Sequence, residues 1–152
     1  MTVRFAHTNI VARDYKKLAK FYMQALGCTV ALPDSTLAGE WLEKGIGIKN
    51  AVIKGITLVL PGFDKTGPTL EIFQYDDMLE NSGMPAANRQ GFGHIAFHVD
   101  DVAAVRDAII SAGGKQLGEI AEKEFKSGTL TFTYTTDPEG NIIELLKWTP
   151  KS

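Results

Sequence analysis

The sequence predicts an α+β fold built from two related β-α-β-β-β modules, and the prediction depends on an internal repeat. His7 is followed seven positions later by Asp14, and His94 is followed seven positions later by Asp101. Later in each half, a glycine, a glutamate and an aromatic residue follow one another at intervals of four: Gly67, Glu71 and Tyr75, then Gly140, Glu144 and Trp148. The same order of landmarks in both halves indicates a duplicated supersecondary unit.

Each half contains one segment with the start and stop signals of a helix. The helices are predicted over residues 15–26 and 102–112. Asp14 and Asp101 suit the N-cap position, because a carboxylate there accepts hydrogen bonds from the free N–H groups of the first turn. Gly27 and Gly113 suit the C-terminal ends, because glycine tolerates the left-handed conformation. Apolar residues recur at helical spacing within both segments, at Leu18, Phe21, Tyr22 and Ala25 and at Val102, Val105, Ile109 and Ala112.

Six segments rich in β-branched, aromatic and aliphatic residues are predicted strands: 4–11, 51–60, 69–75, 92–99, 129–135 and 141–148. The segment 51–60 could hold two strands broken near Gly55, and 28–32 and 116–120 are weaker candidates. Residues 33–50, which include Trp41, are expected to form an irregular excursion over the site. We expect residues 1–152 to form a single domain, with module 1 at about 3–75, a polar linker at 76–90 and module 2 at about 91–148.

The composition is that of a globular protein and argues against several function classes. Hydrophobic residues make up 44% and charged residues 22% of the 152 residues, and the formal net charge is −2. No lysine and arginine cluster suggests nucleic acid binding, and no apolar run is long enough for a bilayer. The N-terminal residues lack the pattern of a signal peptide. Cys28 is the only cysteine and is expected to be buried as a small hydrophobic residue. A cytoplasmic protein with a small-molecule substrate fits these features.

Alternation of side chains along the strands directs polar donors to one face of the sheet. His94 shares a face with His98, Glu71 shares a face with Phe73, and Glu144 lies opposite the face that carries Ile143. Imidazole and carboxylate groups in a cavity are costly unless they have partners. Two imidazoles and two carboxylates suit one divalent ion such as Zn, Ni, Co, Mn or Fe. We therefore predict a curved mixed sheet around a metal-centred cavity, with four ligands: His7, Glu71, His94 and Glu144.

These residues lie in motifs that resemble the vicinal oxygen chelate superfamily, which includes glyoxalase I, methylmalonyl-CoA epimerase, extradiol dioxygenases and bleomycin-resistance proteins. The motifs are His7-Thr-Asn-Ile-Val, Thr69-Leu-Glu71-Ile, Gly93-His94-Ile-Ala-Phe-His-Val-Asp-Asp101 and Asp137-Pro-Glu-Gly-Asn-Ile-Ile-Glu144-Leu. In that superfamily each module supplies one ligand from its first strand and one from its last. The four predicted ligands occupy those positions, and the ligand set is closest to glyoxalase I and the epimerase.

The resemblance implies a lyase or isomerase that abstracts a proton next to a metal-bound carbonyl, through an enediolate-like intermediate. Glu144 is the favoured base, with Glu71 as a second base or only a ligand. One alternative is an Fe(II)-dependent extradiol-type dioxygenase that uses His7, His94 and Glu144. The other is a non-catalytic, antibiotic-type protein that binds small molecules.

Four further residues are candidates for the substrate pocket: Asn9, Trp41, Phe73 and His98. Aromatic packing would explain Trp41 and Phe73 equally well, and a hydrogen-bonded interior histidine is the simpler interpretation of His98. The resemblance also implies a homodimer, in which the two modules of a site come from one chain or from two. Basic residues placed for the carboxylates of glutathione are not evident, so the use of glutathione or CoA stays open.

Overall fold

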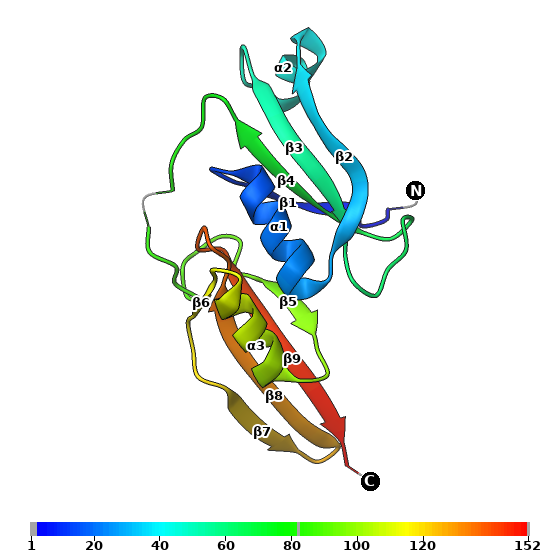
Figure 1. The fold of residues 1–152 in the computed structure, drawn as a ribbon, viewed down its shortest axis with the longest axis vertical. Helices are drawn as coiled ribbons and strands as arrows, with labels where there is room; N and C mark the ends of the chain where they lie inside the picture. Colours follow the sequence, from blue (N-terminus) through cyan, green and yellow to red (C-terminus); the bar gives the residue numbers. More distant parts are fainter. Residues whose placement is uncertain (1–2, 82, 152) are drawn as a thin grey trace. The chain divides into compact units, whose positions relative to one another are not determined.

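The computed structural model describes residues 3–81 and 83–151, which form two compact units, Met1–Asn81 and Ser82–Ser152. Each unit contains one mixed sheet with a helix packed on it, so the predicted α+β class is confirmed (Figure 1). In both sheets one pair of strands is parallel and the other pairs are antiparallel. In the part of the chain that the structure describes, no helix combines the length and apolar character needed to cross a membrane.

The sheet of the first unit has four strands in the order β1-β4-β3-β2. Their bounds are His7–Val11 for β1, Thr29–Ala38 for β2, Val52–Val59 for β3 and Thr69–Tyr75 for β4. Helix α1 (Tyr15–Leu26) packs against β3 and β4 and buries Leu18, Phe21 and Tyr22 there. Leu70 and Ile72 of β4 are fully buried, so the face of the sheet under α1 forms the core of this unit.

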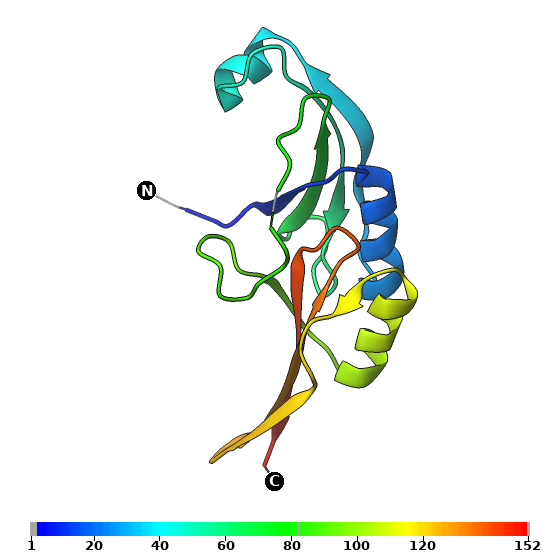
Figure 2. The same cartoon turned by 90° about the vertical axis from the view of Figure 1, so that its left-hand side faces the viewer.

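The segment 33–50 is regular, so the prediction of an irregular excursion is wrong. Strand β2 continues to Ala38, and a short helix, α2 (Glu40–Ile46), follows between two glycines with positive φ, Gly39 and Gly47. Leu42 of α2 is buried with Ala51 and Ile53, and Leu37, Phe73 and Tyr75 pack around this cluster. Figure 2 shows α1 on one side of the sheet and α2 toward the other side. Gly39 and Gly47 are thus the boundaries of this helix.

The predicted break near Gly55 is also wrong, because β3 runs without interruption from Val52 to Val59. Gly55 pairs with Ser35 on one side and with Phe73 on the other. A side chain at Gly55 would collide with the ring of Phe73 and with the backbone oxygen of Ile72. The glycine therefore provides space for an aromatic ring that crosses the strand, and it does not end the strand.

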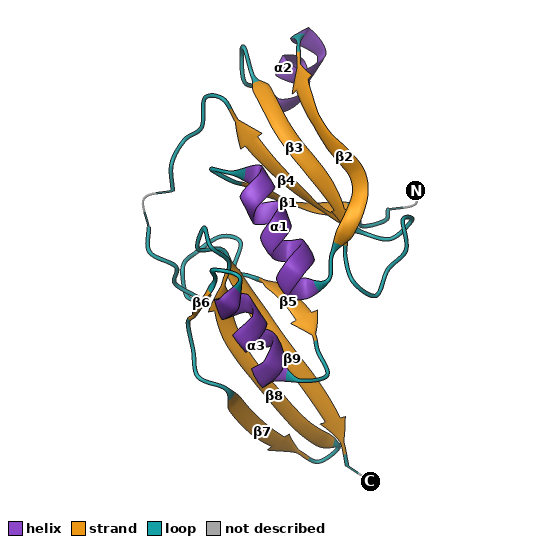
Figure 3. Ribbon diagram, viewed as in Figure 1, coloured by secondary structure: helices purple, strands orange, loops and turns teal. Residues whose placement is uncertain are grey.

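The sheet of the second unit has five strands, shown as arrows in Figure 3. The order is β5-β9-β8-β6, with β7 also paired to β8, and the bounds are Ile95–His98 for β5, Lys115–Gln116 for β6, Ala121–Phe125 for β7, Gly128–Thr136 for β8 and Ile142–Pro150 for β9. Helix α3 (Val102–Ser111) packs on β8 and β9, over the buried side chains of Ile143 and Leu145.

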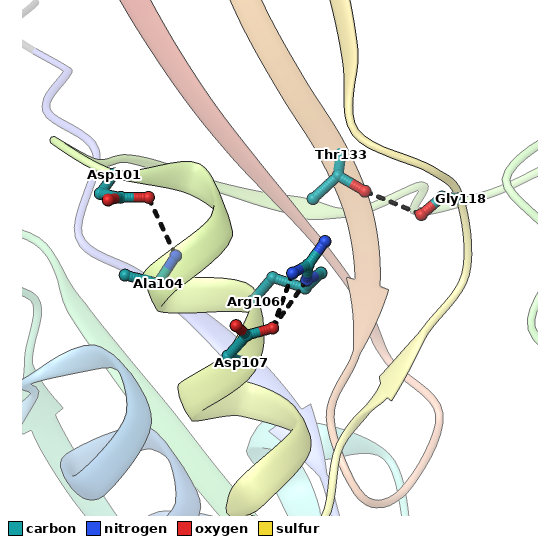
Figure 4. A network of polar contacts seen from close by, with 6 residues as sticks. All are labelled: Asp101, Ala104, Arg106, Asp107, Gly118 and Thr133. Atoms are coloured by element: carbon teal, nitrogen blue, oxygen red, sulfur yellow. Dashed lines mark hydrogen bonds and ion pairs between the residues drawn. The ribbon is translucent and has the colours of Figure 1, made fainter.

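The weak strand candidate at 116–120 is mostly wrong, because only Gln116 lies in a strand, β6, and residues 117–120 connect β6 to β7. Leu117 and Gly118 both donate their backbone N–H to the carbonyl oxygen of Tyr134, each at 3.0 Å. The hydroxyl of Thr133 donates to the carbonyl oxygen of Gly118 at 2.9 Å (Figure 4). These bonds hold the chain beside β8 where the regular ladder is interrupted between the two short strands.

Both predicted helix starts are confirmed. The Asp14 carboxylate accepts from the backbone N–H of Lys17 at 3.0 Å, and the Asp101 carboxylate accepts from Ala104 at 2.9 Å (Figure 4). Gly27 ends α1 with a φ of 72°. Because the caps are local side-chain contacts and the glycine is a local backbone preference, they follow from the sequence without knowledge of the tertiary fold.

Candidate metal centre

In the first unit, a parallel pair of strands brings His7 and Glu71 together. The register of β1 and β4 places Asn9 beside Glu71, and His7 precedes Asn9 by two residues. Residues two apart on a strand share a face, so the two side chains project from the same face. The Nε2 atom of His7 lies 3.4 Å from the Oε2 atom of Glu71.

The second unit repeats this arrangement with His94 and Glu144. The register of β5 and β9 places Ala96 beside Glu144, and His94 again precedes the paired residue by two positions. The Nε2 atom of His94 lies 3.0 Å from the Oε2 atom of Glu144. The duplication noticed in the sequence is therefore also a duplication of strand register, and the register brings an imidazole to a carboxylate in each unit.

Both pairs are accessible from the face of the sheet that is not covered by α1 or α3. The side chains of His7 and Glu71 are 46% and 21% exposed, and those of His94 and Glu144 are 34% and 19% exposed. The histidines are thus the more open member of each pair, and the glutamates lie deeper on the sheet. A small ion or molecule can reach all four groups.

The spacing within each pair suits two ligands of one metal ion. Donors about 2.1 Å from a common ion lie about 3.0 Å apart at an angle of about 90°, and about 3.4 Å apart at about 109°. The observed separations are 3.0 Å in the second unit and 3.4 Å in the first. Imidazole nitrogen and carboxylate oxygen are also suitable donors for a borderline divalent ion. Each pair therefore fits half of the predicted centre.

Among the described residues, neither pair has a third histidine, cysteine, aspartate or glutamate positioned to complete a metal site with it. Across residues 3–81 and 83–151, no group of three or more histidine, cysteine, aspartate or glutamate side chains could hold a metal ion. The structure groups the four predicted ligands as two pairs, one in each unit, and a single centre with all four stays a prediction.

The predicted pocket residues fall in different surroundings. The Asn9 amide donates to the backbone oxygen of Glu71 at 3.4 Å, beside the first pair. Phe73 lies on the same face as Glu71 and packs against the Leu42 cluster. Trp41 is exposed on α2.

His98 is exposed at the end of β5, so its interpretation as an interior histidine is wrong. His98 is the last residue of the four-residue strand β5, and its side chain is exposed to solvent.

Sequence reasoning missed the aromatic neighbour of the second pair, Tyr134. It lies opposite Glu144 in the register of β8 and β9, and its ring centroid is 5.0 Å from that of His94. The corresponding position of the first unit, opposite Glu71 on β3, is Thr57. Tyr134 was within a predicted strand, but only the antiparallel register shows which residue lies beside the glutamate.

A buried carboxylate organises the turn before β9. Asp137, which is 1% exposed, accepts from the backbone N–H groups of Glu139 and Asn141, each at 2.9 Å. It also accepts from the side-chain amide of Asn141 at 2.7 Å, and this closes the turn before β9. In the first unit, Cys28 is buried beyond the end of α1, which confirms the prediction of a buried small hydrophobic residue.

Several known proteins are similar to this chain in sequence. A probable lactoylglutathione lyase of Vibrio parahaemolyticus is 28% identical over 145 residues, which cover 95% of this chain and 90% of the relative. A probable lactoylglutathione lyase of Synechocystis is 29% identical over 146 residues and covers 95% of both chains.

The fold is also found among solved structures. A glyoxalase family protein from Bacillus cereus superposes with a TM-score of 0.83 over 97% of this chain and 95% of its own, at 17% identity. A glyoxalase I variant from Zea mays superposes with a TM-score of 0.61 at 24% identity, over 94% of this chain and 44% of its own. Residues 4–145 match the family described as the Glyoxalase/Bleomycin resistance protein/Dioxygenase superfamily. Since that match extends over most of the sequence, the chain belongs to this superfamily.

Proposed function

We propose that this protein is a divalent-metal-dependent lyase or isomerase of the glyoxalase type, acting on a small carbonyl compound or thioester. The observation that carries the proposal is the imidazole–carboxylate pair found in both units at the spacing of metal ligands. The relatives named as probable lactoylglutathione lyases support a lyase reaction. Proteins of this superfamily generally use a divalent metal, which agrees with the donor types.

In this proposal one ion is held by His7, Glu71, His94 and Glu144. Two neutral imidazoles and two carboxylates give a ligand charge of −2, which balances a divalent cation. The pairs belong to different units, so the centre requires the first pair to meet the second pair of the same chain or of a partner in a homodimer. Either arrangement provides the same four donors.

The ion, when bound, supplies Lewis-acid stabilisation of the negative charge that develops on a substrate oxygen. The residues of the chain move the proton. We assign Glu144 as the base that takes the proton from the carbon next to the carbonyl and returns it to the product. Glu71 is a ligand or a second base. Both carboxylates are partly exposed on the open face, so a substrate there can reach either.

The first experiment measures metal content and activity together. The metal-free protein is loaded separately with Zn, Ni, Co, Mn or Fe and assayed with the hemithioacetal formed from glutathione and a 2-oxoaldehyde, and then with other small thioesters. We expect turnover that is abolished by a chelator and restored by at least one of the ions. A protein that binds none of these ions would contradict the proposal.

The second experiment separates the two glutamates. Glu144→Gln and Glu71→Gln are compared for exchange of the substrate α-hydrogen with deuterium, and Glu119→Gln, which changes an exposed carboxyl outside both pairs, is the control. We expect a loss of about 100-fold or more in exchange for Glu144→Gln if this residue is the base. Unchanged exchange in that variant would remove Glu144 from the role.

Two other results would favour the alternative functions. Oxygen uptake with catechols by the iron-loaded protein would indicate an extradiol-type dioxygenase, in which His7, His94 and Glu144 bind the iron. Retention of a small molecule with equal affinity before and after chelation would indicate a binding protein without catalysis.

A further inference from the structure

The two imidazole–carboxylate pairs have the same backbone register but different backbone support for the histidine. His7 lies within β1 and is paired with Thr69, and the backbone N–H of Thr69 donates to the oxygen of Ala6 at 3.1 Å. His94 lies one residue before β5, whose pairing with β9 begins at Ile95. The backbone of His94 is therefore outside the ladder that holds His7 in place.

The segment that leads to His94 also contains the residues with the greatest backbone freedom. Gly91 and Gly93 precede it, and Gly91 has a φ of 120°. Glycine has more accessible conformations than any other residue, so a histidine that follows two glycines is poorly fixed by its backbone. Nevertheless, His94 is closer to its glutamate than His7 is, at 3.0 Å compared with 3.4 Å, and its side chain is less exposed.

The second pair has an aromatic neighbour, Tyr134. Its ring lies beside the imidazole of His94, with a centroid separation of 5.0 Å and an angle of 42° between the planes. Tilted aromatic pairs at this distance are favourable. Thr57, at the corresponding position of the first unit, has no ring to place beside His7.

Tyr134 is itself held firmly. Its backbone oxygen accepts from both Leu117 and Gly118, and its ring makes an edge contact with Phe132 at a centroid distance of 6.2 Å. The residue is half-buried within β8, between neighbours that fix its strand. A ring held by the sheet is a suitable support for a histidine that the sheet does not hold directly.

We propose that Tyr134 is a positioning residue, which orients the imidazole of His94 toward Glu144 and so prepares the second pair for the ion before the ion arrives. The inference rests on the proposed function, because it takes His94 and Glu144 as ligands. A donor that is already oriented loses less conformational freedom when it binds, and this strengthens binding. The first pair lacks this support.

The experiment compares three variants of the full chain with the wild type. Tyr134→Thr introduces the residue of the first unit and removes the ring, Tyr134→Phe keeps the ring and removes the hydroxyl, and Tyr134→Leu keeps apolar bulk without a ring in case the threonine variant folds poorly. Phe125→Thr, which removes a ring from β7 of the same sheet, is the matched control.

Two quantities are measured. The first is the affinity of the metal-free protein for Zn and Co, by competition with a chromophoric chelator and from the visible spectrum of the bound Co. The second is the NMR chemical shift of the His94 ring protons in the metal-free protein, which reports the ring current of Tyr134. We expect Tyr134→Thr and Tyr134→Leu to bind both ions about threefold to tenfold more weakly and to lose the ring-current shift. Tyr134→Phe and Phe125→Thr should stay within about twofold of the wild type.

The outcomes distinguish the two proposals. If the wild type binds neither ion, the proposed function fails, and the His94 shifts still show whether Tyr134 orients the imidazole. If the wild type binds the ions and the variants without the ring bind them equally well, the positioning role of Tyr134 is refuted while the metal site stands. An equal loss of affinity in Tyr134→Phe would also refute it, because the hydroxyl and not the ring would then be responsible.

Discussion

Asp137 provides a test of how the position of Glu144 depends on the turn before β9. Its buried carboxylate accepts hydrogen bonds from two backbone N–H groups at 2.9 Å and from the Asn141 amide at 2.7 Å. The turn closes immediately before Ile142, which pairs with Thr136, so it sets the register that places Glu144 on β9. Replacing the carboxylate should therefore weaken both the second unit and the second imidazole–carboxylate pair.

The expected magnitude follows from these contacts. In Asp137→Ala, the N–H groups of Glu139 and Asn141 lose their acceptor, and a buried donor left without an acceptor costs about 1–3 kcal/mol. The surrounding turn is only half-buried, so water recovers part of this loss. We expect the free energy of unfolding to fall by about 2–4 kcal/mol. Asp137→Asn keeps an acceptor for the two N–H groups and loses the bond from the Asn141 amide, so it should cost about 1–2 kcal/mol.

Urea unfolding followed by the fluorescence of Trp148 measures this effect in the second unit. A Trp41→Phe background removes the other tryptophan, which lies in the first unit. The two units need not unfold together, so a signal from one of them is required. A cost below about 1 kcal/mol for Asp137→Ala, or an equal cost for the alanine and asparagine variants, would refute the reasoning from hydrogen bonds.

Three further predictions concern the first unit. Burial raises the pKa of the Cys28 thiol to about 11, so a thiol reagent at pH 8 should modify it far more slowly in the native protein than in urea; equal rates would contradict this. The hydrogen bond from Tyr15 lowers the pKa of Asp34, so this carboxylate stabilises the fold above its unfolded pKa and loses that effect as the pH falls through the folded value. Asp34→Asn should therefore lower the urea midpoint at pH 7 and have little effect at pH 2, and an equal loss at both would argue against a role for the charge. Gly55→Val should reduce the free energy of unfolding by about 1–3 kcal/mol because the new side chain collides with the ring of Phe73 and with the backbone oxygen of Ile72, whereas a neutral effect would show that both move away without cost.

The parts of the fold that depend on local rules could be predicted from the sequence. Asp14 and Asp101 cap their helices because a short carboxylate reaches the first-turn N–H groups whatever the tertiary structure is. The alternation of faces likewise placed Glu71 and Glu144 away from the helices, since side chains along a strand alternate with a period of two.

The parts that depend on long-range contacts could not be predicted in the same way. Helix α2 is only seven residues long and buries only Leu42, so there was no repeating apolar pattern to recognise. Gly55 was taken for a break because glycine is uncommon within strands, and its reason, the ring of Phe73, lies 18 residues away in the sequence. Leu42 of α2 and Gly55 of β3 are both explained by residues that are close in space, and the sequence does not show which residues these are.

The same distinction explains why the candidate ligands were visible and their neighbours were not. Both units have the same register between their parallel strands. In each unit the histidine lies two positions before the residue that pairs with the glutamate, so its side chain lies beside the carboxylate. The parallel register that both units share does not fix the type of residue at the antiparallel position across from each glutamate. There, Glu71 faces Thr57 and Glu144 faces Tyr134. The duplicated backbone thus accounts for the presence of two similar pairs, and the residues at the facing positions account for the difference between them.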